Sequence, residues 1–312
     1  IKFVVLSFDS THNQSLVPGD EVITQPLTFV ATPNSISYTG ANCIFIDVDK
    51  KSMGLSANKL NKFLEQNTFK KNGFTFNKKT KRKISACVPM HSFGFPCEIE
   101  KIVDICRSYN IKLVEDAAES LGSLYKKKYT GTFGDLGVFS FNGNKIITSG
   151  GGGVIVTDNE KYAKLAKHLT TTAKEPHPWL YNHNMIGYNF RMPNLNAALL
   201  CAQLEKLDEF IENKRLLAKS YINFFKDLTI DFIQEQKNVR ANYWLMCIML
   251  DNIKQRDKFL KLTNKNGVMT RPAWTLINKL KMYQNCQIYD IKNAVEIESR
   301  LVNIPSSVRI KK

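Results

Sequence analysis

The 312-residue sequence lacks several features that would place it in a special class of protein. It has no run of 18 or more apolar residues, so no transmembrane helix is expected. Ile1 to Ser10 are apolar but have no basic segment and no small-residue cleavage site, so they do not indicate a signal peptide. The seven cysteines are scattered and never spaced as Cys-x-x-Cys, which argues against a disulfide framework and against a zinc site. We therefore expect no metal centre and a reducing, cytoplasmic location.

Acidic residues are too few to balance the basic ones, and the formal net charge is +16. Part of this charge lies in one basic stretch, Lys70 to Lys83. Such a stretch can contact nucleic acid or an acidic surface. Only Phe74 and Phe76 lie near it, and no nucleic-acid-binding motif accompanies it. We interpret the stretch as a solvated loop and expect neither a nucleic acid nor a membrane as a partner.

Short apolar runs alternate with helical patterns through the first two-thirds of the chain. Hydrophobic residues make up 43% of the sequence, enough for a packed core. Strands alternating with helices indicate βαβ units and a mainly parallel sheet, which is an α/β fold. The expected strands are Glu21 to Thr24, Cys43 to Val48, Ile84 to Met90 and Lys112 to Glu115, and the expected helices between them are Leu55 to Leu64 and Glu98 to Tyr109.

The pattern changes after Gly153. Pro193 to Phe225 predicts one long helix with an apolar stripe. Asn242 to Leu250 is a strand candidate, and Lys161 to Thr172 and Gln255 to Thr263 are helix candidates. We therefore expect a large domain over residues 1–200 and a small C-terminal α+β domain over residues 201–312.

Asp116 stands at the end of the expected strand, within Val114-Glu-Asp-Ala-Ala-Glu119. Ligands of open α/β sheets bind beyond the carboxyl ends of the strands. An Asp at this point is compatible with a metal ligand, a helix N-cap or a partner for a ring nitrogen.

Lys145 follows a strand-like run and a Gly/Asn turn, and Gly150 to Gly153 and another apolar run come after it. A lysine held between apolar strands loses part of the stabilisation of its charge, which suits a Schiff-base lysine. The other interpretation is an exposed lysine in a hairpin turn. Asp116 upstream favours the first, because a lysine and a carboxylate for the pyridinium nitrogen are the groups that pyridoxal phosphate needs. Ser140 is positioned to donate to its phosphate.

In combination, these motifs resemble the DegT/DnrJ/EryC1/StrS family of sugar aminotransferases over about residues 17 to 309. The matching stretches include Pro18-Gly-Asp-Glu-Val-Ile-Thr24, Thr28-Phe-Val-Ala-Thr32, Glu115-Asp-Ala-Ala118, Ser140-Phe141 with Lys145, and Gly187-Tyr-Asn-Phe-Arg-Met192. The resemblance extends to the branch that aminates nucleotide-linked 4-keto-6-deoxy sugars on bacillosamine- or legionaminic-acid-type routes. It implies fold type I of the pyridoxal-phosphate transferases, which is the aspartate aminotransferase-like fold.

The resemblance also implies roles for individual residues. Lys145 would be the Schiff-base lysine and proton shuttle, and Asp116 the partner of the pyridine nitrogen. Phe29 would stack on the cofactor ring, and Ser140 would bind the phosphate. Glu119 stands where many members have Gln, beside the ring hydroxyl. Asn189 would reach the phosphate of a neighbouring subunit, which implies a homodimer with shared active sites. Weaker candidates for substrate contacts are His91, His177, Trp179, Arg191 and Arg271.

The N-terminal region departs from the family pattern. Members carry a Gly-Thr-x-Ala-Leu-like stretch that binds the cofactor phosphate at a helix start. Ile1 to Leu16 contains no such motif, and we expect an incomplete N-terminal portion of the large domain.

The sequence therefore predicts transfer of an amino group from L-glutamate to the ketone of a nucleotide-linked sugar, in amino-sugar and surface-polysaccharide biosynthesis. A dehydratase of the same fold replaces the lysine, so Lys145 counts against that alternative. A second alternative is a non-catalytic homologue that has lost phosphate binding. A third is a nucleic-acid binder driven by charge.

Overall fold

A computed structural model describes residues 16–309, and its centre is a sheet of seven strands in the order β10-β9-β6-β5-β1-β2-β15. All neighbours in this sheet are parallel except the edge pair β10 and β9. The strands are β1 (Glu21–Thr24), β2 (Asn42–Ile46), β5 (Ile84–Val88), β6 (Lys112–Asp116), β9 (Leu136–Ser140), β10 (Gly153–Val156) and β15 (Gln287–Tyr289). The mainly parallel α/β architecture expected from the sequence is confirmed.

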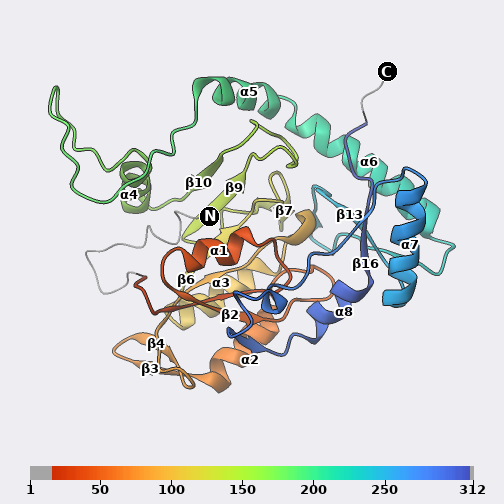
Figure 1. The fold of residues 1–312 in the computed structure, drawn as a ribbon, viewed down its shortest axis with the longest axis horizontal. Coiled ribbons are helices and arrows are strands. Elements are labelled where there is room, and N and C mark those ends of the chain that lie inside the picture. The colour runs from red at the N-terminus through yellow and green to blue at the C-terminus, as the bar shows by residue number, and fades with distance from the viewer. Residues whose placement is uncertain (1–15, 310–312) are drawn as a thin grey trace.

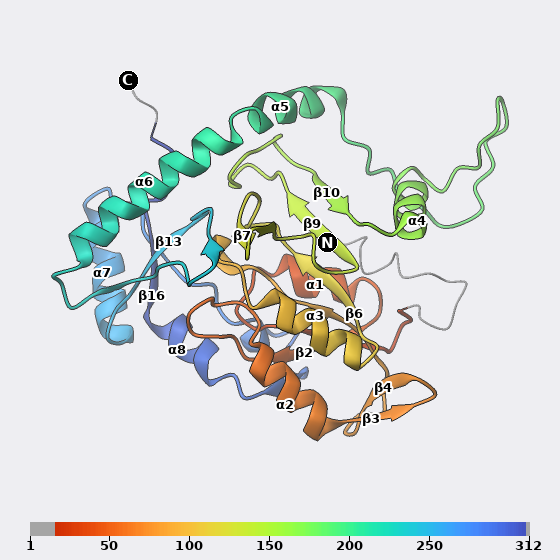
Figure 2. The same cartoon turned by 180° about the vertical axis from the view of Figure 1, so that it is seen from behind.

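Helices cover both faces of this sheet (Figures 1 and 2). On one face lie α2 (Ala57–Asn67) and α3 (Ile99–Ser108), whose apolar sides join those of the strands in one buried cluster. On the other lie α1 (Ala31–Ser37) and α4 (Glu160–Thr170). The spacing of Ile99, Ile102, Val103 and Cys106 in the sequence predicted the inner side of α3, and all four are buried. Most positions of these strands are apolar, because both faces of the sheet are covered.

A second, antiparallel sheet follows in the order β11-β13-β16-β14. Its strands are β11 (Asp231–Phe232), β13 (Met246–Met249), β14 (Arg271–Pro272) and β16 (Leu301–Ile304). The helices α6 (Leu207–Phe225), α7 (Ile253–Lys265) and α8 (Lys292–Arg300) accompany it. The expected strand over Asn242 to Leu250 is shorter than predicted, because residues 242–245 form a turn that becomes important below.

The two sheets do not divide the chain at a single residue. Between β14 and α8 the chain returns to the large sheet through Ile277–Lys279, and β15 then pairs with β2 at its edge. The boundary at residue 200 therefore stays a prediction.

Two smaller sheets lie at the periphery. The first is the hairpin β3 (Thr68–Lys71) and β4 (Phe74–Asn77), and the second joins β7 (Leu124–Tyr125), β8 (Lys128–Tyr129) and β12 (Val239–Arg240). The basic stretch lies on the hairpin, where Lys70 and Lys78 donate to backbone carbonyl groups of neighbouring elements.

The prediction of one helix over Pro193 to Phe225 is wrong. The chain forms α5 (Asn194–Leu204) and α6, separated at Glu205 and Lys206. The two helices meet different surroundings, since α6 buries Ile211, Leu217 and Ala218 whereas α5 buries none of its residues in this chain. A single straight helix cannot lie along two surfaces that face different directions.

Candidate active site

The candidate site lies at the carboxyl ends of β6 and β9. These strands are parallel neighbours, with Asp116 opposite Val138, so their ends reach the same edge of the sheet. Asp116 is the last residue of β6, and Ser140 is the last residue of β9. Lys145 follows in a turn in which its backbone N–H donates to the Asn142 carbonyl at 3.0 Å. Strand topology thus brings together residues that are far apart in the sequence.

Asp116 is 1% exposed, and its carboxylate is held in a defined orientation. One oxygen accepts a hydrogen bond from the Thr32 hydroxyl at 2.6 Å, and the other accepts from the Ala118 N–H at 3.2 Å. Thr32 lies in α1, and the sequence did not indicate a role for it. A carboxylate anchored in this way is suited to hold a protonated ring nitrogen.

Lys145 is nearly buried, with 11% of its side chain exposed. Its Nζ lies 3.6 Å from Glu119 Oε1 and 4.3 Å from the centre of the Trp244 ring. The structure thus rules out an exposed lysine in a hairpin turn, the alternative that the sequence left open. Trp244 was also missed from the sequence, because 99 residues separate it from Lys145 and no local pattern connects them.

Glu119 is buried, and its two carboxyl oxygens differ in their surroundings. Oε2 accepts the Phe93 N–H at 2.8 Å, whereas Oε1 has no hydrogen-bond partner among the described residues. Burial raises the pKa of Glu119 to about 8, although the nearby Lys145 ammonium and the Phe93 N–H act in the opposite direction. A buried carboxyl oxygen without a partner points to a group that binds beside it.

Phe29 and Ser140 are the other two residues of this chain that the sequence predicts for the cofactor. The Phe29 ring is 50% exposed, and its centre lies 6.4 Å from that of Trp274, which in turn stacks on Phe93. Ser140 is half-buried, and its hydroxyl oxygen accepts the Asn142 N–H at 3.4 Å. Together with Asp116, Lys145 and the unpartnered oxygen of Glu119, these groups fit pyridoxal phosphate, which needs an amine, a carboxylate, a ring contact and phosphate donors.

His91 is fully buried beside the site, and both its ring nitrogens have partners within the protein. Nε2 pairs with Glu115 Oε2 at 3.1 Å, and Nδ1 accepts the Cys97 N–H at 3.2 Å. Glu115 also accepts backbone N–H groups from Gly131, Phe133 and Gly134. Burial by itself would raise the pKa of Glu115, but His91 and these N–H groups hold it below its usual range. In this chain His91 makes protein contacts, and its role towards a substrate stays a prediction.

The other predicted residues lie outside this cluster. His177, Trp179, Asn189 and Arg191 are exposed on the loop between α4 and α5, which extends away from the sheet (Figures 1 and 2). Their contacts are local, as in the Arg191 guanidinium that donates to the Thr171 carbonyl at 3.3 Å. Arg271 is exposed on β14 and bonds Asn264 at 3.0 Å. Within one chain these residues do not contact Lys145.

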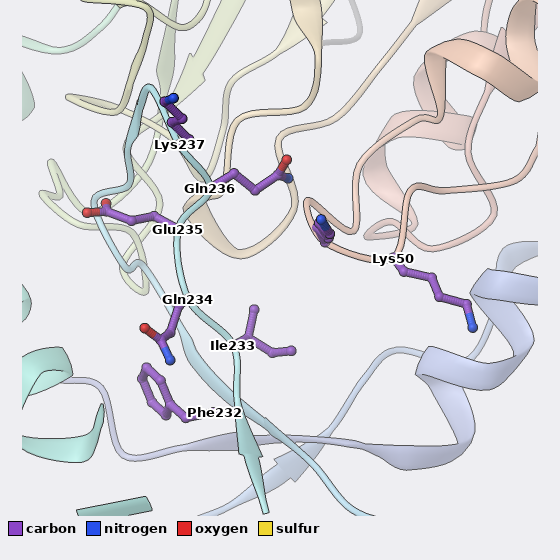
Figure 3. Close-up of a pocket in the computed structure, with 8 residues that line it drawn as sticks. Lys50, Phe232, Ile233, Gln234, Glu235, Gln236 and Lys237 are labelled. Atoms are coloured by element: carbon purple, nitrogen blue, oxygen red, sulfur yellow. The ribbon is translucent and has the colours of Figure 1, made fainter. Parts of the chain in front are cut away.

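A hollow of about 510 Å³ lies between Lys50, Lys51 and residues 232–237 (Figure 3). None of the candidate site residues lines it. Lys50 is paired with Glu296, and Glu235 is held by Arg215. Because none of its lining residues belongs to the candidate site, the hollow adds nothing to that site.

Residues 16–309 contain no group of three His, Cys, Asp or Glu side chains arranged to hold a metal ion. No helix within the same residues combines the length and the apolar character needed to cross a membrane. The N-terminal stretch without the phosphate-binding motif lies, up to residue 15, outside the described residues.

The chain is similar to known aminotransferases over most of its length. The family model of the DegT/DnrJ/EryC1/StrS aminotransferase family matches residues 9–312. The chain is 36% identical to the GDP-perosamine synthase of Escherichia coli O157:H7 over 289 residues, covering 92% of this chain and 74% of that protein. It is 29% identical to the dTDP-4-amino-4,6-dideoxy-D-glucose transaminase of Shigella dysenteriae, covering 94% of this chain and 76% of that one.

Solved structures show the same fold. Helicobacter pylori PseC is an aminotransferase involved in the biosynthesis of pseudoaminic acid. It superposes with a TM-score of 0.86 at 22% identity, covering 99% of this chain and 79% of that one. A family member from Brucella abortus gives a TM-score of 0.88 at 21% identity, covering 100% and 80%. The expected aspartate aminotransferase-like fold is confirmed. The chain belongs to the DegT/DnrJ/EryC1/StrS aminotransferase family, and it is therefore an aminotransferase whose cofactor is pyridoxal phosphate.

Proposed function

We propose that the chain moves an amino group from L-glutamate to the C4 ketone of a nucleotide-linked 4-keto-6-deoxy sugar, in the biosynthesis of a surface polysaccharide. Relatives that share about a third of its sequence over most of its length are named for nucleotide-linked amino sugars. A spore coat polysaccharide biosynthesis protein of Bacillus subtilis is 30% identical and covers 92% of this chain and 74% of that protein. These names support the substrate class but not one particular sugar.

The observation that carries the proposal is the position of Lys145. Its Nζ is nearly buried, 3.6 Å from a carboxyl oxygen that has no hydrogen bond, at the strand edge where Asp116 also lies. A lysine with only a structural role would have its neighbouring carboxyl group fully bonded. The arrangement suits an amine that must be released to react.

Each residue of the site has one task in this reaction. When bound, pyridoxal phosphate supplies a ring that draws electrons from the reacting carbon. Asp116 would keep the ring nitrogen protonated, Phe29 would cover the ring, and Ser140 would donate to the phosphate. Lys145 Nζ would hold the cofactor at rest and would carry the proton that is exchanged with the substrate in each half-reaction.

We further propose that the active unit is a homodimer. Large apolar side chains are exposed from the loop after α4 through α5, among them Tyr181 at 78%, Ile186 at 89% and Leu195 at 86%. An exposed apolar surface of this kind favours a protein interface. Asn189 lies on the same loop and is exposed, so it is free to reach the cofactor phosphate of a partner copy.

The described cysteines are all free thiols, which supports a cytoplasmic location.

Visible absorption of the purified chain with pyridoxal phosphate tests the proposal. We expect a band of the lysine-bound cofactor that Lys145→Ala lacks, that L-glutamate removes, and that a nucleotide-linked 4-keto-6-deoxy sugar then restores. If L-glutamate removes the band but no such sugar restores it, the chain is an aminotransferase for another acceptor. A folded chain with no band at all supports the non-catalytic homologue instead.

A further inference from the structure

The turn formed by residues 242–245 links the small sheet to the candidate site. The Asn242 side-chain amide donates to the Glu119 and Leu121 carbonyl groups, each at 2.9 Å. The Trp244 indole N–H donates to the Asn144 carbonyl at 2.8 Å, one residue before Lys145. The wall behind Lys145 and Glu119 is therefore supplied by a distant part of the chain and is closed by hydrogen bonds.

The Phe93 N–H that binds Glu119 is itself held in place. The Phe93 carbonyl accepts the Leu245 N–H at 3.2 Å, and the Phe93 backbone adopts a left-handed conformation with φ of 59°. The next residue, Gly94, also has positive φ, and a Cβ there would lie 2.0 Å from the Asn242 side-chain oxygen. Strain of this kind persists only where surrounding contacts hold it. The direction of the N–H toward Glu119 Oε2 is therefore fixed by the fold.

With Oε2 engaged as an acceptor, Oε1 is the atom of Glu119 that faces the site. The charged or titratable groups near it are Lys145 at 3.6 Å, the Asp116 carboxyl group, and the buried thiol of Cys247. Lys145 is the amine that bonds the aldehyde of pyridoxal phosphate, and the ring hydroxyl of that cofactor is on the carbon next to the aldehyde. A cofactor bonded to Lys145 would bring this hydroxyl oxygen, which carries negative charge when it ionises, close to Glu119 Oε1.

We propose, building on the function proposed above, that Glu119 binds the cofactor as a neutral acid, with the proton on Oε1 donated to the ring hydroxyl oxygen, and that loss of this proton weakens binding. A carboxylate in that place would set two negative oxygens side by side in a buried site. Binding at alkaline pH therefore requires one proton from solvent, which converts the carboxylate of Glu119 to the carboxylic acid. No other reactant is needed, and Glu119 acts as a pH-dependent gate for the cofactor.

The titration of Glu119 sets the pH range of this gate. Burial raises the pKa of the carboxyl group to about 8, so the group keeps its proton at neutral pH and loses it in mildly alkaline solution. Affinity is expected to fall as pH rises through this value, because protonation and binding favour each other.

The test is the affinity of the full chain for pyridoxamine phosphate, measured by calorimetry at pH 7 and pH 9. This probe has the ring hydroxyl but no aldehyde, so it forms no bond to Lys145. The probe's own ionisations are equal for all variants, and the ratio of dissociation constants between variants isolates Glu119. We expect the dissociation constant of wild type, divided by that of Glu119→Gln, to rise roughly tenfold from pH 7 to pH 9. Glu160→Gln removes an exposed carboxylate on α4 and should follow wild type.

An equal pH dependence of wild type and Glu119→Gln would overturn the inference. If Glu119→Gln does not fold, wild type alone tests the inference. Calorimetry of probe binding in two buffers of different ionisation enthalpy then gives the number of protons that wild type takes up on binding. At pH 9, an uptake of nearly one proton in addition to any proton taken up by the probe supports the gate. If no such additional uptake is found, the gate is rejected. Failure of wild type to bind the probe at any pH would instead reject the proposed function, and the gate with it.

Discussion

Two buried carboxyl groups near the end of β6 lie four residues apart and have opposite surroundings. Glu115 accepts three backbone N–H groups and pairs with His91, and its pKa is held below the usual range. Glu119 accepts one N–H group, keeps one oxygen without a hydrogen bond, and has its pKa raised to about 8. Burial is similar, so the difference comes from the pairing of Glu115 with His91 and from the larger number of N–H groups that it accepts. The comparison teaches that a saturated carboxyl group holds the fold, whereas an unsaturated one marks the place of a ligand.

The largest expected effect concerns Lys145, the neighbour of the unsaturated Glu119. Lys145→Ala should reduce amino transfer by roughly a thousandfold or more, because the amine that binds the cofactor and moves the proton is lost. Thermal unfolding should change little, since Lys145 has no fully formed hydrogen bond to Glu119. Steady-state transfer assays measure the effect, and Lys164→Ala, an exposed lysine on α4, is the control. Retained transfer would remove Lys145 from the mechanism.

The next effect is on the Glu115 side. Glu115→Gln should lower the free energy of unfolding by roughly 3 kcal/mol, because an amide N–H2 replaces an oxygen that accepts backbone N–H groups and His91 loses its ionic partner. Denaturant unfolding measures the change. A loss of less than about 0.5 kcal/mol would show that the saturated carboxylate does not hold the fold, and the comparison would fail.

An effect on stability of similar size is its pH dependence. Between its usual pKa of 4.5 and the native value of about 8, Glu119 keeps in the folded chain a proton that the unfolded chain has released. The contribution of this group to stability is therefore full below pH 4.5, falls as pH rises, and is lost above pH 8. Wild type should lose up to about 1.4 kcal/mol per pH unit relative to Glu119→Gln in this window. Denaturant unfolding at pH 5, 6.5 and 8 measures the difference, and parallel curves would contradict the assigned titration.

The smallest effect is expected at Trp244. Trp244→Phe keeps an aromatic face for Lys145 but loses the N–H bond to Asn144, so unfolding should become easier by about 1 kcal/mol. Trp244→Leu removes the face as well and should also weaken retention of the cofactor during dialysis. If both variants retain the cofactor equally, the aromatic face has no part in positioning Lys145.

Much of the large sheet could be predicted from the sequence. β1 was predicted with its observed bounds, and β2, β5 and β6 within two residues at each end, because strands covered on both faces are mostly apolar. Lys145 and Asp116 could be paired because the chemistry of one cofactor requires both. The break between α5 and α6 could not be predicted, since α5 is apolar around most of its surface and so shows no direction of packing.

The sequence by itself determined the family and the parallel sheet and singled out Lys145 as the candidate cofactor lysine, because these depend on local apolar patterns and on motifs a few residues long. Only the tertiary structure decided that Thr32 would hold Asp116, that the Trp244 turn would close on Lys145, and that Glu115 would be saturated while Glu119 is not. These contacts join segments separated by many residues, and the two glutamates look alike in the sequence. Their difference arises from how many donors the fold brings to each buried carboxyl group, and that number is a property of packing.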